Sequence, residues 1–475
     1  MTKKKFVSTA LAGAAAMVLA GCSLIPAYER PAAPVPAVYP GAQAASSAQS
    51  PQSPASTLAW QDFFTDARLA KLIETALANN RDLRVSVLNI EQARAQFQIQ
   101  RAAQFPALDL TASGSRSSPN ALQAVGVGGS VASSYSVNLG ITAWELDFFG
   151  RVASLKEQGL AQFLATEESR KAAQISLIGA VASGWLTLIA DDQLLELTRQ
   201  TLATREESQK LTRMRFDSGV VSEIDLRLAE TLAESARASY AEQQRLRMQD
   251  ENALALLLGA PVPAEATEGG RSLDAIALMP DLPAGLPSDL LGERPDIRAA
   301  EQQLLAANAN IGAARAAFFP RVTLTSSIGT ASSEFSGLFD KGSKAWSFAP
   351  QITLPIFDAG RNQAGLDSAR AGREIAVAQY EKSIQTAFRE VADALAGRAT
   401  LGEQLRALRA QSNAEEVRFK LSDLRYRNGI ASALDLLDSQ RSLYSVQQAA
   451  VQTRLLQLQN QVALYKTLGG GWATR

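Results

Sequence analysis

The last part of this 475-residue chain repeats its middle at a fixed spacing of 210 positions. The sequence around Gly219 reads RFDSGVVSEIDL, and the sequence around Gly429 reads RYRNGIASALDL. The same shift aligns Gly150-Arg151 with Gly360-Arg361, and other matches are shifted by 214. A repeat of this kind decides the fold before any local pattern does. We therefore expect two copies of one unit, each with the same pair of very long helices and the same pair of strands.

Composition narrows the functions that such a chain can have. The 47 basic residues balance the 47 acidic ones, whereas a nucleic-acid-binding protein carries a basic excess. The chain has no histidine and a single cysteine, Cys22, so the usual zinc sites and cysteine or serine–histidine nucleophiles cannot be built in its body. No phosphate-binding glycine loop is present. Carboxylate pairs, lysines and oxygen-ligated metals are not excluded by this composition. We nevertheless expect a protein that is not an enzyme, with no catalytic residues, no metal, no cofactor and no nucleic-acid partner.

The N-terminus has the pattern of an export signal. Three lysines at positions 3–5 precede an apolar run from Phe6 to Ala20, which predicts a signal peptide rather than a membrane-spanning helix. The run ends Leu19-Ala20-Gly21-Cys22 and so resembles a bacterial lipobox, in which the peptide is cut before a cysteine that is then acylated. The alternative is a stray cysteine near an ordinary cleavage site. Ser23 in place of Asp implies sorting to the outer membrane, and several acyl chains on Cys22, S-diacylglycerol and N-palmitoyl, would anchor the protein stably.

The distribution of proline shows where long helices can form. Seven of the 18 prolines fall between Pro26 and Pro54, which predicts an extended, poorly packing tether. No proline occurs from Asn120 through Ala260 or after Pro355, and proline inside a helix costs about 3 kcal/mol. The long helices are expected at Val152–Arg215, Ser222–Leu258, Arg361–Arg427 and Ser432–Leu468, and shorter ones at Asp66–Asn79, Asp82–Gln104 and Asp296–Phe318.

Each pair of long helices should turn at a glycine and restart at a capped serine. Gly219 and Gly429 occupy the turns, where glycine supplies the left-handed conformation that ends a helix. Asp225 follows Ser222 by three positions, as Asp435 follows Ser432. This spacing predicts a capping box at the start of each return helix.

Segments with a period of two precede each long first helix. Between Ser134 and Asp147, apolar residues alternate with small polar ones, which indicates a strand with one apolar face. Similar alternation runs through 108–115, 322–328 and 346–354, and Gly- and Ser-rich loops at Ser117–Val131 and Ser332–Ser343 join the strands in pairs. In the first hairpin, the predicted apolar face consists of Tyr135, Val137, Leu139, Ile141 and Ala143.

The strands are about ten residues long, which is the height of a strand that crosses a membrane. Two ordinary surface hairpins would show the same alternation. The outer-membrane signal and the small polar residues of the second face favour a membrane barrel. A barrel made from one chain needs at least about eight strands, and an open sheet edge is not tolerated in lipid. Several copies must therefore share one barrel, and this argument does not choose among two, three or four.

The sequence resembles the TolC-like outer membrane factor family. Within it, the sequence is most similar to the NodT-like lipoprotein branch that works with resistance-nodulation-division (RND) drug pumps. The resemblance covers nearly the whole mature chain. Five motifs carry it: WELDFFGR at 144–151, ERPDIRAAE at 293–301, AARAAFFP at 313–320, PIFDAGR at 355–361 and YRNGIASALDLLDSQRSLY at 426–444. The expected fold is mainly α-helical with a membrane β-barrel.

The resemblance implies a homotrimer with a shared twelve-stranded barrel in outer-membrane lipid, continued by a twelve-helix α-barrel through the periplasm of a Gram-negative bacterium. It further implies a passive channel whose helical end docks on a periplasmic adaptor protein, while an inner-membrane RND-type transporter supplies the energy. The exported molecules would be drugs or other small molecules. The alternatives are an exit duct of the same fold for an ABC-type secretion system, and a structural lipoprotein without a pore.

The resemblance also points to residues at the periplasmic end. Family members close this end with rings of acidic side chains and with tyrosine contacts, and the matching positions are Asp225, Tyr426, Asp435 and Asp438. Asp225 and Asp435 have an alternative role as capping-box partners, and the alternative for Asp438 is a solvated helix face. Some relatives carry an arginine two positions after the hairpin glycine, where this chain has Ala431, so Arg425, Arg427 and Arg441 are the candidate substitutes.

The tips of the two helical hairpins are the expected adaptor contacts, with turn geometry alone as the alternative. These tip residues are Gly219, Val220, Val221, Gly429, Ile430 and Ala431. The expected division of the chain is a signal peptide (1–21), a lipidated tether (22–60), a first repeat (61–258), a linker (259–293), a second repeat (294–469) and a tail (470–475). In the first repeat the β-hairpin is expected at about 105–148 and the helical hairpin at about 150–258; in the second they are expected at about 319–357 and about 360–468.

Overall fold

The computed structural model describes residues 23–40, 57–118, 131–267, 272–276, 282 and 289–472. The predicted signal peptide, Cys22 and most of the first strand-connecting loop lie outside these residues. The chain divides into two compact units. Unit 1 contains Met1–Ala32, Asn89–Glu167 and Ala299–Tyr380, and unit 2 contains Ala33–Leu88, Glu168–Arg298 and Glu381–Arg475. Each unit therefore takes segments from both halves of the sequence.

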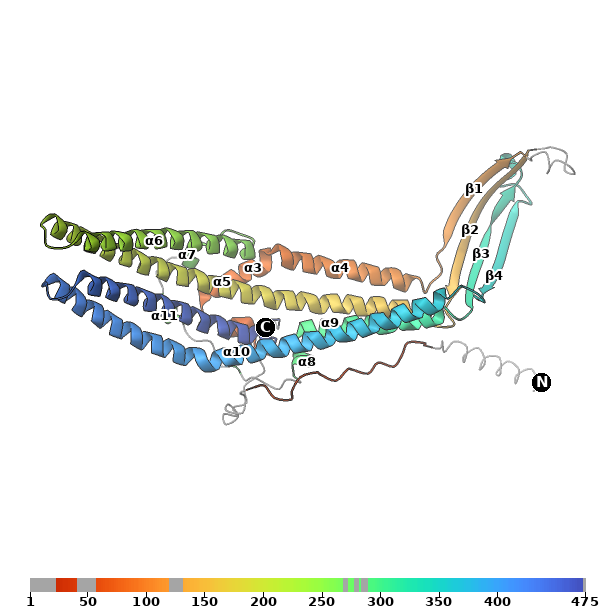
Figure 1. The fold of residues 1–475 in the computed structure, drawn as a ribbon. Coiled ribbons are helices and arrows are strands. Elements are labelled where there is room, and N and C mark those ends of the chain that lie inside the picture. The colour runs from red at the N-terminus through yellow and green to blue at the C-terminus, as the bar shows by residue number, and fades with distance from the viewer. Residues whose placement is uncertain are drawn as a thin grey trace. The chain divides into compact units, whose positions relative to one another are not determined.

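Four long helices dominate the chain (Figure 1). Helices α5 (Arg151–Asp217) and α10 (Arg361–Arg427) have 67 residues each, which corresponds to about 100 Å of helix. Their return partners are α6 (Glu223–Leu258) and α11 (Ala433–Thr467). The shorter helices are α3 (Ala67–Asn79), α4 (Arg81–Ala102) and α9 (Pro295–Ala316). All seven lie within two residues of the bounds predicted from the sequence.

The remaining helical elements within the described residues are single turns. They are α2 (Trp60–Phe63), α7 (Ala264–Thr267), α8 (Leu290–Glu293), and the 3₁₀ turns η3 (Leu273–Ala275) and η4 (Phe335–Gly337). The linker between the repeats thus contains the short elements α7, η3 and α8.

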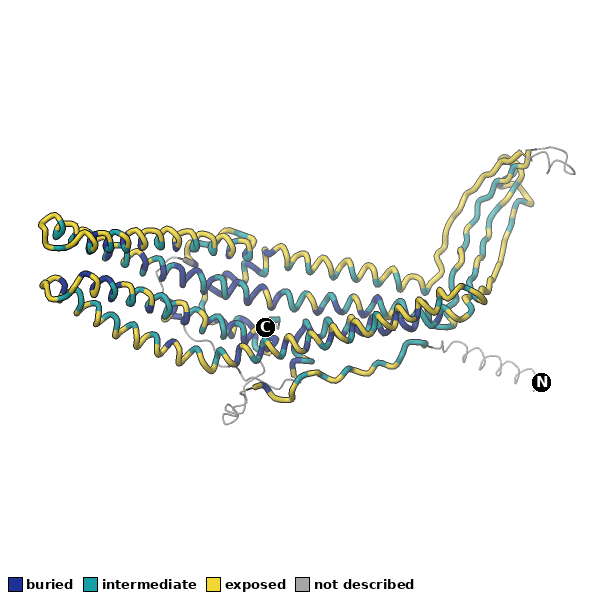
Figure 2. The backbone as a smooth tube through the Cα atoms, viewed as in Figure 1, coloured by how far each residue is buried: buried dark blue, intermediate teal, exposed yellow. Residues whose placement is uncertain are grey.

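The hydrophobic core of unit 2 is built on the middle of α5. Trp185 of α5 is fully buried, and Tyr465 of α11 stacks on Phe63 with ring centroids 4.0 Å apart. The Tyr465 hydroxyl donates to the Leu58 carbonyl at 2.6 Å, so its polar end is satisfied. Helix α5 contains an 18-residue stretch apolar enough to cross a membrane, but 61% of that stretch is buried inside the protein. This stretch is therefore the core face of a packed helix (Figure 2).

The four strands form one antiparallel sheet in the order β1-β2-β3-β4 (Figure 1). The strands are β1 (Asp109–Ser117), β2 (Ala132–Leu146), β3 (Arg321–Ser332) and β4 (Lys344–Thr353). Strands β2 and β3, from the two halves of the sequence, pair in the centre. Strands β1 and β4 are the edges, and within the described residues neither has a second partner.

The register separates an apolar face of the sheet from a small polar face. Leu110, Leu139, Ile328 and Trp346 lie opposite one another and form one row across all four strands. On the other face, pairs of serine hydroxyls meet across strands: Ser113 with Ser136 at 2.9 Å and Ser327 with Ser347 at 2.8 Å. None of the residues in the four strands is buried within the described chain. An uncovered apolar face is the arrangement expected of strands that contact lipid.

A β-bulge in β2 corrects one sequence prediction. The register shifts between Ile141 and Trp144, and Ala143 adopts a positive φ of 48°. The bulge inserts an unpaired residue, so the alternation of faces changes phase. Ala143 is therefore not part of the apolar row, as an uninterrupted period of two predicted. After the bulge, Trp144 pairs with Leu324 and Leu146 with Val322, which keeps large apolar residues on the same face.

The tether also differs from its prediction, because residues 24–30 pack along α9 instead of packing poorly. Asn308 of α9 donates to the Pro26 carbonyl at 2.8 Å, and Arg315 donates to the Leu24 carbonyl at 3.2 Å. The segment thus runs antiparallel to α9. An extended chain satisfies its carbonyl groups in this way without forming regular structure.

Glu301 fixes the other end of the same segment. Its carboxylate accepts a hydrogen bond from the Tyr28 hydroxyl at 2.9 Å and two from the Arg30 guanidinium at 2.7 and 2.8 Å. Glu301, Asn308 and Arg315 are spaced by seven residues, so they lie on one face of α9. Three residues spaced by seven along α9 therefore form the face that binds the tether.

Gly312 provides a test of this docking. A Cβ atom at this position would lie 2.6 Å from both Ile25 Cγ1 and Ser154 Oγ, and overpacking of this kind costs about 1–3 kcal/mol. We expect Gly312→Ala to release the tether, so that a protease specific for glutamate cleaves after the exposed Glu29 about 5- to 100-fold faster. Mass spectrometry of the released N-terminal fragment measures the rate.

The matched control is Gly372→Ala, because Gly372 also lies in a helix of unit 1 but an added Cβ there meets no atom within 4 Å. Its cleavage rate should equal that of the wild type. Equal rates in all three proteins would show that the tether does not depend on this contact.

Candidate functional site

The candidate site comprises the ends of the two helical hairpins of unit 2, where α5 turns into α6 and α10 turns into α11 (Figure 1). Gly219 and Gly429 have φ values of 70° and 72°. The amide of the residue after each glycine donates back to the carbonyl of Arg215 or Arg425 at 2.9 Å. Both helices thus end in the Schellman arrangement that requires glycine, as the sequence predicts.

Both return helices begin with the predicted capping box. Ser222 accepts from the Asp225 amide at 3.2 Å, and the Asp225 carboxylate accepts from the Ser222 amide at 3.1 Å. Ser432 and Asp435 repeat the same pair of contacts at 3.2 and 3.3 Å. The two aspartates named as gate candidates therefore have the local capping role that was their alternative. Each box stabilises its helix start by about 1 kcal/mol.

Tyr426 is buried between the two hairpins. Only 3% of the residue is exposed, and it packs with Ala433 and Leu436 in a small apolar cluster. Its hydroxyl lies 3.3 Å from the Thr212 hydroxyl of α5. Of the predicted gate residues, Tyr426 is therefore the one through which the second hairpin contacts the first.

Arg215 is the partner of Tyr426, and sequence reasoning did not select it. Its guanidinium lies 4.5 Å from the centre of the Tyr426 ring, and it donates to the carbonyls of Tyr426 and Arg427 at 3.2 Å each. The candidate substitutes do not reach Tyr426 through any described hydrogen bond: Arg427 pairs with Asp423, and Arg441 pairs with Asp438. The signal that could have found Arg215 is the repeat itself, since Arg425 is its counterpart.

Asp438 has two arginine partners, so its carboxylate is not simply a solvated group on a helix face. It accepts from Arg418 of α10 at 2.6 Å and from Arg441 at 2.5 Å. These guanidinium groups, Arg418 foremost, lower the pKa of the Asp438 carboxyl below its ordinary value. The contact with Arg418 ties α10 to α11 within the second hairpin.

The hairpin ends expose apolar side chains at matching positions of the two repeats. Val220 and Ile430 are 70% and 69% exposed, and Ile224 and Leu434 are 79% and 62% exposed. The sequence named the first pair as adaptor contacts but missed the second. Large apolar groups exposed together on turns mark a surface that another protein covers. Within the described residues, no group of three acidic or cysteine side chains could hold a metal ion.

Comparison with known proteins assigns the family. The family model described as "Outer membrane efflux protein" matches residues 72–260 and 286–470. This chain belongs to the outer membrane efflux protein family. The two matched ranges correspond to the two halves that the sequence repeat relates.

Among curated proteins, the chain is 50% identical over 458 residues to the probable efflux pump outer membrane protein TtgC of Pseudomonas putida, covering 96% of this chain and 94% of TtgC. It is 46% identical over 460 residues to the outer membrane protein OprJ of Pseudomonas aeruginosa, with the same coverages.

Solved structures of outer membrane channels share the fold. The open state of the MtrE outer membrane channel of Neisseria gonorrhoeae matches with a TM-score of 0.83 at 44% identity, covering 95% of this chain and 99% of that one. The CmeC outer membrane channel of Campylobacter jejuni matches with a TM-score of 0.85 at 27% identity, covering 95% of each chain. The chain therefore has the TolC-like fold that its motifs led us to expect.

Proposed function

We propose that this protein is the outer membrane channel of a tripartite efflux pump and passively exports drugs or other small molecules. The observation that carries the proposal is the sheet, with one apolar face, one face of small polar residues and two open edges, joined to pairs of very long helices. Family membership and the efflux-pump relatives support the same function. The channel needs no catalysis, because the pump that it serves supplies the energy.

We infer that three copies form the channel. Four strands per chain cannot close a membrane barrel, and an unpaired edge is not tolerated in lipid. Three copies give twelve strands, with β1 of one copy pairing with β4 of the next. Two copies would already reach eight strands, so the number three rests on the family resemblance.

The partners follow from the hairpin ends. We propose that Val220, Ile224, Ile430 and Leu434 contact a periplasmic adaptor protein, which links the channel to an inner-membrane transporter of the RND type. Their exposure and their repetition in both halves support this role. An ABC-type secretion system would use the same fold, but the efflux-pump relatives favour small-molecule export.

We further propose that Cys22 carries S-diacylglycerol and N-palmitoyl groups that anchor the chain in the outer membrane. Support comes from the docked tether in unit 1. The Leu24 carbonyl is bound by Arg315, which lies near the end of α9 and six residues before strand β3 begins. The segment beyond Leu24 thus starts close to the base of the sheet, where acyl chains can enter the membrane.

Asp438 is our candidate for the periplasmic constriction, alongside Asp225, Tyr426 and Asp435. A ring of three carboxylates selects cations.

We expect Asp438→Ala to raise single-channel conductance and to weaken cation selectivity, because both the charge and the contact with Arg418 are lost. The wild type should lose its cation selectivity when Asp438 becomes protonated. Because Arg418 and Arg441 lower the pKa of Asp438, this loss should occur only below about pH 4, the ordinary pKa of an aspartate.

Planar-bilayer recording of the purified protein, with its mass measured in detergent, tests both the trimeric channel and the role of Asp438. A trimer that conducts weakly and prefers cations supports the channel. A monomer without conductance contradicts it and favours a structural lipoprotein without a pore. Unchanged conductance in Asp438→Ala, with a conducting wild type, rejects the role of Asp438 alone.

A further inference from the structure

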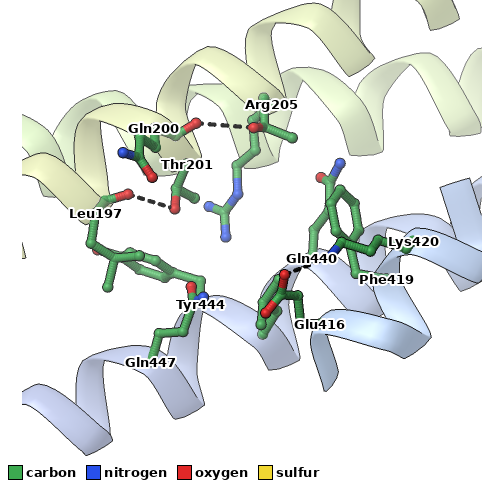
Figure 3. A pocket seen from close by; sticks show the side chains of 12 residues that line it. Leu197, Gln200, Thr201, Arg205, Glu416, Phe419, Lys420, Gln440, Tyr444 and Gln447 are labelled. Carbon is green, nitrogen blue, oxygen red and sulfur yellow. Dashed lines mark hydrogen bonds and ion pairs between the residues drawn. The ribbon is translucent and has the colours of Figure 1, made fainter. Parts of the chain in front are cut away.

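Away from the hairpin ends, unit 2 contains a pocket of about 230 Å³ lined by residues of α5, α10 and α11. Figure 3 shows that side chains from both hairpins converge on it: Arg205 and Thr201 from α5, Phe419 from α10, and Tyr444 from α11. The volume exceeds that of a cavity that binds benzene, which is about 150 Å³. A molecule of one aromatic ring with a substituent therefore fits.

Arg205 is the unusual group in this pocket. It is 5% exposed, and Nη1 donates to the Leu232 carbonyl at 3.2 Å. Its Nε is buried and has no hydrogen-bond partner within the described residues. Its carbon Cζ lies 5.5 Å from the centre of the Tyr444 ring. Buried arginines normally pair with a carboxylate, but no described carboxylate forms an ion pair with this one.

The other charges near the pocket do not compensate Arg205. Glu416 lines the pocket, but its carboxylate accepts from the Lys420 ammonium at 2.6 Å and is satisfied at the exposed rim. Burial lowers the pKa of Arg205, and the nearby Arg441 adds to this effect. The guanidinium group remains charged at neutral pH, since its ordinary pKa lies above 12. The pocket therefore holds a buried positive charge that an anion would neutralise.

The other lining residues indicate which groups a ligand of this pocket would carry besides a negative charge. Leu197, Phe419, Leu443 and the ring of Tyr444 are apolar or aromatic, and Thr201, Thr204 and three glutamines supply hydrogen-bonding groups. A planar carboxylate matches a guanidinium group through parallel hydrogen bonds. An aromatic ring next to Phe419 and Tyr444 gains stacking contacts.

We propose that this pocket binds a small aromatic monocarboxylate, with the carboxylate on Arg205 and the ring against Phe419 and Tyr444. The inference does not depend on channel activity. Because α5 belongs to the first hairpin, and α10 and α11 to the second, a bound molecule would bridge the two hairpins of one chain. Such a ligand would stabilise their arrangement by mass action.

The test uses 4-fluorobenzoate as the probe and the ¹⁹F NMR line width as the readout, with the purified full-length protein in detergent. We expect saturable broadening with the wild type. The neutral isostere 4-fluorobenzamide should bind at least about tenfold more weakly, because it cannot form the charged hydrogen bonds to Arg205. This comparison needs no variant, so it remains decisive even if a substitution impairs folding.

Two variants test whether the probe binds at Arg205. Arg205→Gln should lose at least about tenfold in affinity for 4-fluorobenzoate while keeping the mass and thermal stability of the wild type. Arg199→Gln is the matched control, because Arg199 is an exposed cation on α5 that pairs with Glu196 and does not line the pocket. Its affinity should stay within about twofold. Equal binding by wild type and Arg205→Gln, or equal binding of the acid and the amide, would overturn the proposal. Absence of saturable binding to the wild type would also overturn it.

Discussion

Deleting strands β3 and β4, residues 321–353, and joining their flanks with a short linker should abolish integration into the membrane. The deletion leaves β1 and β2, with β2 now an open edge. Three such chains would supply six strands, which is fewer than the roughly eight strands of the smallest membrane barrels. We expect no heat-resistant oligomer on electrophoresis. Only the lipid proposed on Cys22 should then hold the protein in the membrane, so a deletion variant that also lacks this lipid should be extracted completely by urea.

The control shortens only the connection between the same strands, residues 333–343, and leaves both strands intact. This variant should still form membrane-embedded oligomers, because every residue pair of the β3–β4 register lies outside the shortened segment. If the deletion variant formed them as well, the shared barrel would be wrong. The long helices would then have to assemble without the strands.

Arg215→Ala should open the periplasmic end. The substitution removes a cation–π contact worth about 0.5–2 kcal/mol and two hydrogen bonds from a charged donor worth about 1.5–3 kcal/mol each, all between the two hairpins. Allowing for non-additive losses, a destabilisation of at least about 2 kcal/mol raises the population with parted hairpin ends about 30-fold. Single-channel recording should show a large-conductance state that the wild type visits rarely.

Arg213→Ala is the matched control, since Arg213 lies two positions away on α5 but pairs with Glu230 of its own hairpin. Its conductance should match that of the wild type. If both variants behave like the wild type, the contact between Arg215 and Tyr426 does not hold the end closed.

The features that depend on local pattern were predictable from the sequence. Helix bounds, the two glycine turns and the two capping boxes follow from proline spacing and from short motifs, because each depends on residues a few positions apart. The four strands followed from alternation in the same way. The family followed from motifs that recur in order along the chain.

The features that the sequence missed depend on residues far apart in the chain. Arg215 meets Tyr426, 211 positions away, and the tether contacts Glu301 across more than 270 positions. Local pattern contains no distance information of this kind. The bulge at Ala143 is a different failure, because a period of two was extended through a residue whose backbone leaves the strand conformation. The alternative expected for Asp438, a solvated helix face, overlooked Arg441, which lies three positions away and pairs with it.

The open edges of the sheet have a consequence for how the channel is made. A newly exported copy carries an apolar face and two unpaired strands, and such species aggregate readily. In the shared barrel that we propose, the last backbone hydrogen bonds form with other copies. Folding and assembly would then be a single event whose yield depends on how often nascent chains meet. Halving the rate of synthesis would lower the yield of finished channels by more than half, so efflux capacity should respond to gene dosage more steeply than in proportion.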